Sequence, residues 1–304
     1  MSRRRELDSR LASLRDIGKI MASMKNLSYM ETRKLGRCIE SQGRVVAGIE
    51  AAARDFLDHY PQGPRSPAGT RTLHVVIGAE RGFCGDFNGA VLEALEPESA
   101  HADPSASPIV TVGTRLAAAL EGHPRLVASI QGASAAEEVP TVLNRLVQTL
   151  GRILEDRGAG AVGVIHWDAQ TQTVREVSLL PPFQGTAEIE APRYACPPGL
   201  NLAPAAFLAA LIKHYLFAAL HALLYSSLMA EHQQRVRHLE GALERIDGRV
   251  RELEQHRNLV RQEEITEEIE LMLLNLTERA GPASDDPTAG SGTTTDPALG
   301  SARP

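Results

Sequence analysis

The residues with the most potential for chemistry lie in a glycine-rich loop, GAERGFCGDFNG, at 78–89. The loop follows an apolar run at 73–78, and glycines after a strand often bring backbone amides close to a phosphate. A dinucleotide-binding loop needs GxGxxG and a mononucleotide P-loop needs Gly-Lys-Ser or Gly-Lys-Thr, and neither is present here. We therefore interpret these glycines as turn residues and expect no bound nucleotide.

Other reactive side chains lack the neighbours that catalysis or metal binding requires. Cys84 has no histidine or acid directly beside it, which favours a core thiol over a nucleophile. Asp168 follows an apolar run without a second carboxylate, so we interpret it as a turn residue. His232, His238 and His256 lack the four-residue spacing of a metal-binding pair and are interpreted as solvated surface residues. We predict no catalytic residue, no metal and no cofactor.

The elements that hold these residues follow an α/β pattern. Short runs rich in Val and Ile alternate with amphipathic segments, which indicates a mainly parallel, Rossmann-like sheet. The expected strands are 73–78, 108–113, 125–130, 161–167 and 174–180, and the expected helices are 86–96, 114–121 and 135–157.

Two long helices flank this α/β region. In 205–279 apolar residues recur at alternating steps of three and four, the spacing of a coiled-coil seam: Val236, Leu239, Leu243, Ile246, Val250 and Leu253. Residues 4–59 repeat that spacing at Leu7, Leu11, Leu14, Ile17, Met21, Met24 and Leu27. Four glycines weaken the second helix, so it needs a partner. We predict an antiparallel pair in which Leu11, Leu14 and Met21 face the C-terminal seam.

The predicted fold is therefore α/β plus long helices, an antiparallel two-helix coiled coil with an inserted α/β domain. Its parts are an N-terminal helix (1–59), a linker and α/β domain (60–204), a C-terminal helix (205–279) and a disordered tail (280–304).

Composition narrows the class of protein further. The 304 residues carry a net charge of −6 with both signs interleaved, which argues against a nucleic-acid partner. Three distant cysteines favour a reduced, cytosolic chain, and the start lacks the apolar core of a signal peptide. The most apolar segment, 205–230, contains Lys213, His214 and His221, so we expect it to pack on the protein and not to span a membrane.

Three blocks in this order resemble the gamma subunit of F-type ATP synthases. They are LASLRDIGKIMASMKNLS at 11–28, ERGFCGDFN at 80–88, and SLMAEHQQRV at 227–236 followed by RNLVRQEEITEEI at 257–269. The resemblance implies a central rotary stalk that transmits torque between a membrane ion-translocating ring and a catalytic hexamer, and that is not itself an enzyme. It implies alpha, beta and epsilon subunits and the c-ring as partners. It also implies a peripheral position on the cytoplasmic face of the bacterial inner membrane.

The same resemblance suggests contact residues. Those implied toward the beta subunits are Arg261, Gln262, Thr266, Lys19, Met24 and Lys25, and those toward the ring and epsilon are Tyr215, Glu231 and His232. Asp86 stands where the family has a second glycine, and Phe217 where it has an acid. Two alternatives stay open at this point: a small-ligand α/β enzyme with coiled-coil extensions, and a coiled-coil adaptor unrelated to a motor.

Overall fold

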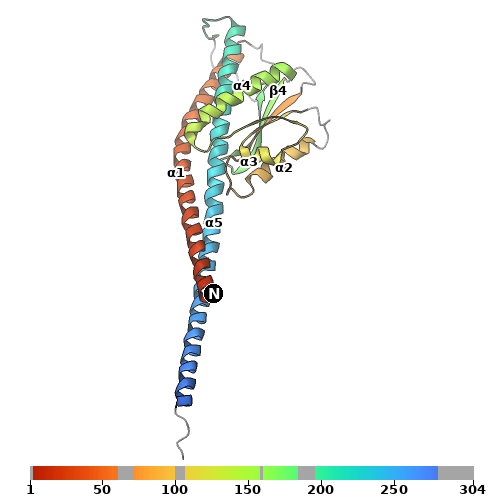
Figure 1. Ribbon diagram of the computed structural model, residues 1–304. Helices are drawn as coiled ribbons and strands as arrows, with labels where there is room; N and C mark the ends of the chain where they lie inside the picture. Colours follow the sequence, from red (N-terminus) through yellow and green to blue (C-terminus); the bar gives the residue numbers. More distant parts are fainter. Residues whose placement is uncertain (1–2, 61–70, 100–106, 158–159, 184–195, 280–304) are drawn as a thin grey trace, which may run out of the picture. The chain divides into compact units, whose positions relative to one another are not determined.

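The computed structural model describes residues 3–60, 71–99, 107–157, 160–183 and 196–279 (Figure 1). The chain divides into two compact units, Ser13–Arg249 and a second formed by Met1–Ala12 with Val250–Pro304. Both units contain parts of the two longest helices, α1 (Arg3–Leu57) and α5 (Pro204–Arg279). The predicted linker at 61–70 and the predicted tail from 280 lie outside the described residues.

Within Ser13–Arg249, α1 and α5 lie side by side and run antiparallel (Figure 1). A Cβ built on Gly18 would lie 3.6 Å from Cγ2 of Ile246. Farther along α1, Nζ of Lys25 lies 3.6 Å from Oε1 of Glu240. Gln42 donates from Nε2 to the carbonyl oxygen of Ala218 over 3.1 Å. Partner numbers fall on α5 as they rise on α1, which confirms the predicted antiparallel pair.

The second unit contains the same pair of helices at their other ends. Arg4 lies 3.8 Å from Glu264, and Arg257 lies 3.7 Å from Asp8. Three apolar side chains are buried there, namely Leu7, Leu11 and Val260. Their burial explains why this short unit is compact.

Burial along the helix pair follows the predicted seam residues but not every apolar residue with the same spacing. Leu239 is fully buried, and Leu14, Met21, Leu243, Ile246, Val250 and Leu253 are half-buried. Ile17 and Leu27, which have the same spacing on α1 but were not predicted to face α5, are 48% and 62% exposed. The next residues, Gly18 and Ser28, face inward instead. One position along a helix turns a side chain by about 100°, so a small shift in phase exposes the apolar neighbour.

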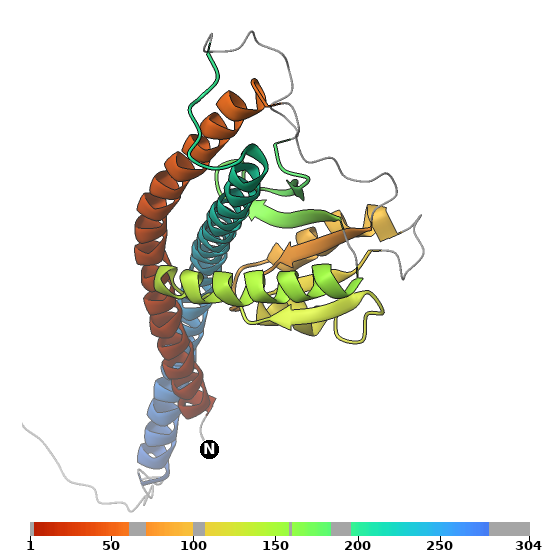
Figure 2. The same ribbon diagram turned by 90° about the horizontal axis from the view of Figure 1, so that it is seen from above.

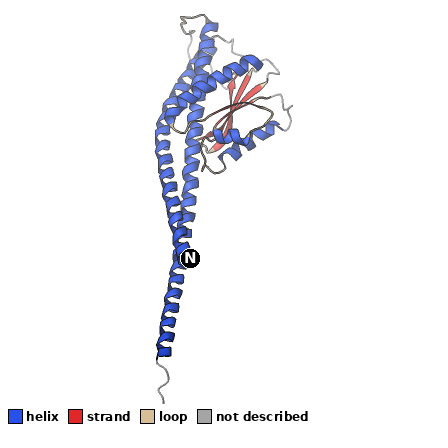
Figure 3. Cartoon of the chain, viewed as in Figure 1, coloured by secondary structure: helices blue, strands red, loops and turns tan. Residues whose placement is uncertain are grey.

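The α/β region forms one five-stranded sheet (Figure 3). Its strands are β1 (Thr72–Ile77), β2 (Ile109–Val112), β3 (Leu126–Ile130), β4 (Ala161–Asp168) and β5 (Thr173–Leu180), in the spatial order β3-β2-β1-β4-β5. All neighbouring pairs are parallel except β4 and β5, which form an antiparallel pair. The connecting helices are α2 (Phe87–Ser99), α3 (Thr114–Ala119), η1 (Ala136–Glu138) and α4 (Val139–Arg157). This mainly parallel sheet confirms the predicted fold class.

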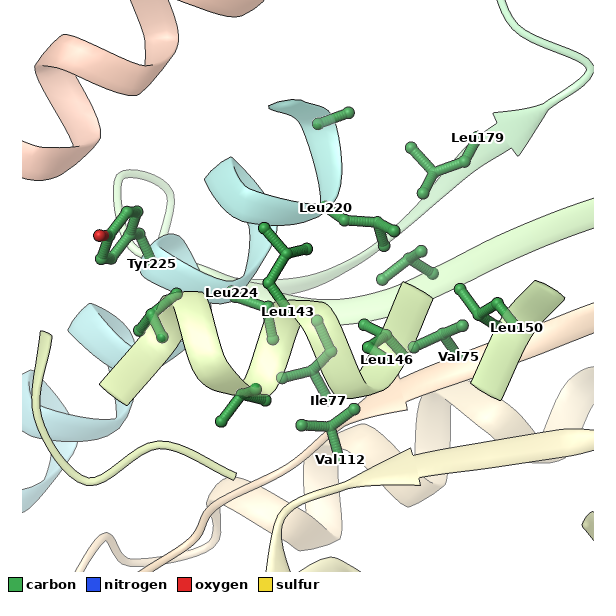
Figure 4. Packing of buried hydrophobic residues seen from close by; sticks show 14 of the residues in the cluster. Val75, Ile77, Val112, Leu143, Leu146, Leu150, Leu179, Leu220, Leu224 and Tyr225 are labelled. Carbon is green, nitrogen blue, oxygen red and sulfur yellow. The ribbon is translucent and has the colours of Figure 1, made fainter. Parts of the chain in front are cut away.

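Side chains alternate between the two faces of the sheet, as strand geometry requires. On one face, Leu73, Val75 and Ile77 of β1 pack with α4, α5 and α1. On the other, Val76 packs with Phe87 of α2 and other residues of α2 and α3. Figure 2 shows α4 along the first face, and Figure 4 shows its leucines between the strand residues and α5.

The apolar start of α5 is part of this core. By length and composition alone α5 contains a segment that could cross a membrane, with a mean hydropathy of 1.7 over eighteen residues. Leu220, Leu224 and Leu228 of that region are nonetheless buried against the sheet and α4. Core packing therefore accounts for the buried share of that segment, which is 28% of it.

Candidate functional site

The carboxyl end of β1 is where an open α/β sheet would bind a ligand. Here the chain runs from β1 to β2 and β3 on one side of β1 and then crosses to β4 on the other side, so the strand order reverses next to β1. In this chain a carboxylate from α5 occupies that position: Glu231, 3% exposed. The backbone N–H of Glu80 donates to its Oε2 over 3.1 Å, and the N–H of Arg81 donates to its Oε1 over 3.1 Å. The protein itself thus uses amide donors that could otherwise meet a ligand phosphate.

Arg235 neutralises this carboxylate from one helical turn farther along α5. Its guanidinium donates to Glu231, to the carbonyl oxygen of Gly82 over 3.0 Å, and to Nδ1 of His232 over 3.2 Å. The side chains of Glu231 and Arg235 are 4% and 5% exposed. A buried ion pair needs such additional hydrogen bonds to offset the loss of hydration, and here both partners have them.

A second carboxylate, Glu80, ties together three loops at the same edge of the sheet. It accepts hydrogen bonds from the N–H and the hydroxyl of Thr114, at 2.9 and 2.8 Å, and from the N–H of Gly132 at 2.8 Å. Thr114 begins α3 and Gly132 follows β3. We call Glu80, Glu231, His232 and Arg235 the polar joint.

Helix α1 reaches the neighbouring loop through another buried carboxylate. Oε2 of Glu31 accepts a hydrogen bond from the N–H of Ala136 over 3.3 Å, at the start of η1. Lys34 donates to Glu31 over 2.8 Å and to Glu137 over 3.2 Å. Both long helices are therefore attached to the sheet through charged side chains as well as apolar contacts.

A second set of contacts joins α5 to the β4–β5 turn. The N–H of Ala169 donates to the hydroxyl of Ser226 over 3.1 Å. Gln172 is hydrogen-bonded to both Gln233 and Arg237. Asp168 accepts from the N–H of Gln170 over 2.9 Å, which confirms its interpretation as a turn residue.

Burial shifts the pKa values of His232 and Glu231 in the direction that favours their neutral forms. Burial and, to a smaller extent, the charge of Arg235 lower the pKa of His232 to about 4, although Glu31 and the Ser134 backbone oppose the shift. Burial also raises the pKa of Glu231, against the opposing effect of Arg235. His232 is therefore a neutral imidazole at pH 7, and it accepts a hydrogen bond from Arg235 through Nδ1.

The glycine-rich loop is shaped for packing. Gly85 has a φ of 62°, in the left-handed region that favours glycine. A Cβ on Gly89 would lie only 2.0 Å from a carboxylate oxygen of Asp86, so glycine leaves room for the aspartate in place of the family's second glycine. Cys84 is buried, and burial raises the pKa of its thiol. A core thiol agrees with the prediction from sequence.

The residues suggested for contact with the ring or epsilon lie inside the chain. Tyr215, Glu231 and His232 are 9%, 3% and 5% exposed, so their prediction as contact residues disagrees with their burial. The ring of Tyr215 packs at a tilt against that of Phe183, with 4.7 Å between ring centroids. The interpretation of His232 as a surface residue is likewise wrong, whereas His238 is exposed. The physical reason is that α5 turns this face toward the sheet.

The residues suggested for contact with the beta subunits are divided between the two compact units. Arg261, Gln262 and Thr266 are exposed in the second unit, and Thr266 bonds back to the Gln262 carbonyl oxygen over 2.9 Å. Lys19 pairs with Asp16 over 3.0 Å on the surface of α1. Met24 and Lys25 are half-buried.

Sequence reasoning missed Glu80, Glu31 and Arg235. A signal was available for Arg235, because an acid and a base four residues apart on a helix are spaced to form an ion pair. Glu80 gave no such signal, since its partners lie 34 and 52 positions away. Among the described residues no group of three or more His, Cys, Asp or Glu could hold a metal ion.

Comparison with known sequences finds one family by two routes, a family model and individual relatives. A family model described as ATP synthase matches residues 3–271. The chain is 26% identical over 278 residues to the ATP synthase gamma chain of Kineococcus radiotolerans, covering 84% of this chain and 91% of that protein. It is 24% identical over 301 residues to the gamma chain of Streptomyces avermitilis, covering 91% and 96%.

Comparison with solved structures shows a shared fold. A chain in the mitochondrial ATP synthase of Euglena gracilis has a TM-score of 0.62 at 15% identity, covering 94% of this chain and 99% of that one. A chain in the central stalk and c-ring of the Tetrahymena thermophila mitochondrial ATP synthase has a TM-score of 0.52 at 17% identity, covering 73% and 99%.

Proposed function

Since the chain belongs to the ATP synthase gamma chain family, we propose that it rotates as the central stalk and transmits torque between the membrane ion-translocating ring and the catalytic hexamer. As a member of that family it is a non-catalytic subunit of an F-type ATP synthase. The observation that carries the proposal is the family match over nearly the whole chain. The antiparallel pairing of α1 with α5 supports it, because a paired helix resists bending and twisting better than a single one.

The polar joint disfavours the alternative of a small-ligand enzyme. The N–H groups of Glu80 and Arg81 already donate to Glu231, and that of Thr114 donates to Glu80. A phosphate would have to displace two buried, hydrogen-bonded carboxylates at this edge of the sheet, which costs several kcal/mol. Calorimetric titration with ATP and with NAD should show no binding tighter than roughly millimolar.

The proposed partners are the alpha and beta subunits of the hexamer, the epsilon subunit and the c-ring. The proposed location is the cytoplasmic face of a bacterial inner membrane, where the subunit is peripheral. Purification of the tagged chain from its own cells tests this proposal. Alpha and beta subunits should copurify with it, and an adaptor unrelated to a motor would bring down neither.

Within this function, Arg261 and Gln262 are the proposed coupling contact with one beta subunit at a time. Both are exposed, and a guanidinium can form forked hydrogen bonds with a carboxylate loop. Thr266, Lys19, Met24 and Lys25 are proposed as additional contacts.

The double substitution Arg261→Ala with Gln262→Ala tests the coupling contact. It should leave assembly intact and reduce ATP-driven rotation, ATP hydrolysis and ion pumping. Arg251→Ala, an exposed arginine of the same helix, is the matched control and should change none of them. If the double variant matches this control in all three measurements, these residues are ordinary solvated side chains.

A further inference from the structure

We infer that the polar joint is a clamp that passes torque between the sheet domain and α5, with Glu231 and Arg235 as its positioning residues. This inference rests on the proposed rotary function. It concerns which residues within the chain transmit the torque from the sheet domain to α5. It starts from the convergence of separate loops on one short stretch of α5, residues 226–237.

Three loops are connected to that stretch, two of them directly and one through Glu80. Loop 78–86 after β1 is held by Glu231 and Arg235, through the amides of Glu80 and Arg81 and the carbonyl of Gly82. The β4–β5 turn is held by Ser226, Gln233 and Arg237. The loop after β3 joins indirectly, because Glu80 binds the N–H of Gly132. A load on any of these loops is therefore carried to the same three turns of α5.

Directional bonds are needed at this position because apolar packing is not directional. Leu220, Leu224 and Leu228 bury the sheet against α5, and such contacts resist separation more than they resist sliding or rotation. Hydrogen bonds weaken steeply when their angle changes, so those of Glu231 and Arg235 fix the angular position of the helix. Their burial also keeps water from replacing them during a displacement.

Helix α1 strengthens the arrangement from the other side. Glu31 binds the N–H of Ala136, and Gln42 of α1 binds the Ala218 carbonyl of α5. The sheet domain is thereby attached to both long helices, so a torque on it turns the pair and does not peel one helix from the other.

The test uses the assembled ATP synthase that contains the variant chain. Arg235→Met keeps the length and apolar stem of the side chain and removes its charge and its five donors. ATP hydrolysis should continue, and the number of ions pumped per ATP hydrolysed should fall several-fold. The matched control is Arg44→Met, which removes the exposed pair with Glu40 on the surface of α1, and it should leave that ratio unchanged.

Two further measurements separate a clamp from a merely structural role. Arg235→Lys keeps the charge beside Glu231, so it should assemble more readily and lose less coupling than Arg235→Met. It should still lose some coupling, because lysine lacks the fork that reaches Gly82 and His232. Cysteines introduced as Gln172→Cys and Gln233→Cys, with Cys38 and Cys196 changed to serine, allow a short bis-maleimide to bridge the β4–β5 turn and α5. This covalent bridge should restore pumping to the Arg235 variants.

The outcomes distinguish the clamp from the function on which it rests. If both Arg235 variants melt at a lower temperature but pump the normal number of ions per ATP, the clamp is overturned and the joint only stabilises the fold. If the unmodified chain fails to support ATP-driven pumping in a complex that lacks its own gamma subunit, the proposed function itself is overturned.

Discussion

At the scale of single residues, buried His232 makes the stability of the chain depend on pH. Its pKa is lowered from the ordinary 6.5 to about 4 in the folded chain, so the unfolded chain binds the proton first as the pH falls. The stabilisation is fully present above about pH 6.5 and is lost progressively toward pH 4. Between pH 7 and pH 5 the loss is about 2 kcal/mol.

Urea unfolding of the full chain checks this prediction. The wild type should lose more stability between pH 7 and pH 5 than His232→Gln, which cannot titrate. Glu231 acts in the opposite direction, because its raised pKa removes stability as the pH rises above its ordinary 4.5. It is common to both proteins, so equal pH dependence in the two would contradict a neutral, buried His232.

A second residue-scale prediction concerns thiol reactivity. Burial raises the pKa of Cys84 and shields its sulfur, whereas Cys196 is exposed. Because the thiolate is the reactive form, a disulfide reagent at pH 8 should label Cys196 rapidly and Cys84 only on unfolding. Mass spectrometry of digested, labelled protein measures both rates. Rapid labelling of Cys84 would show that the β1 loop opens readily.

The sequence could predict Cys84 and Asp168 because each depends on its immediate neighbours. It could not predict Glu80, whose hydrogen-bond partners come from loops that only the folded sheet brings together. His232 was misjudged because α5 is long and mixes apolar with charged residues. The local sequence therefore does not indicate which face of the helix meets the sheet.

At the scale of elements, burial predicts unequal costs for two leucines of the α5 seam. Leu239 is fully buried and Leu243 is half-buried. Leu239→Ala should therefore lower the free energy of unfolding by about 2 to 5 kcal/mol, and Leu243→Ala by less. Thermal and denaturant unfolding of the two variants compare them directly. A larger effect at Leu243 would contradict the observed phase of the helix pair.

The helices and strands themselves were largely predictable, because each leaves a repeating pattern of apolar residues. All five strands and the long helices lie within a few residues of the predicted ranges. The phase of α1 was less predictable, since Gly18 carries no apolar signal although it faces Ile246. A pattern of large apolar residues cannot reveal a contact made by a residue without a side chain.

At the scale of the whole molecule, the exposed end of α5 predicts self-association of the isolated chain. Leu271, Met272, Leu273, Leu274 and Leu276 are each 57% to 64% exposed, beyond or at the end of the family match. Contiguous apolar surface of this kind is uncommon on soluble monomers. Sedimentation should show concentration-dependent oligomers, and a chain truncated after Glu270 should remain monomeric. Identical behaviour of the two chains would exclude this end as the cause.

The insertion of the sheet between the two long helices also imposes a waiting time during synthesis. Gln42 of α1 and its partner Ala218 are 176 residues apart. At about 5 to 20 residues per second, α1 leaves the ribosome roughly 10 to 35 s before that part of α5 exists. During this time one face of the sheet stays partly uncovered, because α5 completes the packing over Leu73, Val75 and Ile77. A nascent chain therefore presents an unpaired helix and a half-covered sheet, and chaperones that bind apolar segments should act on it before Ala218 emerges.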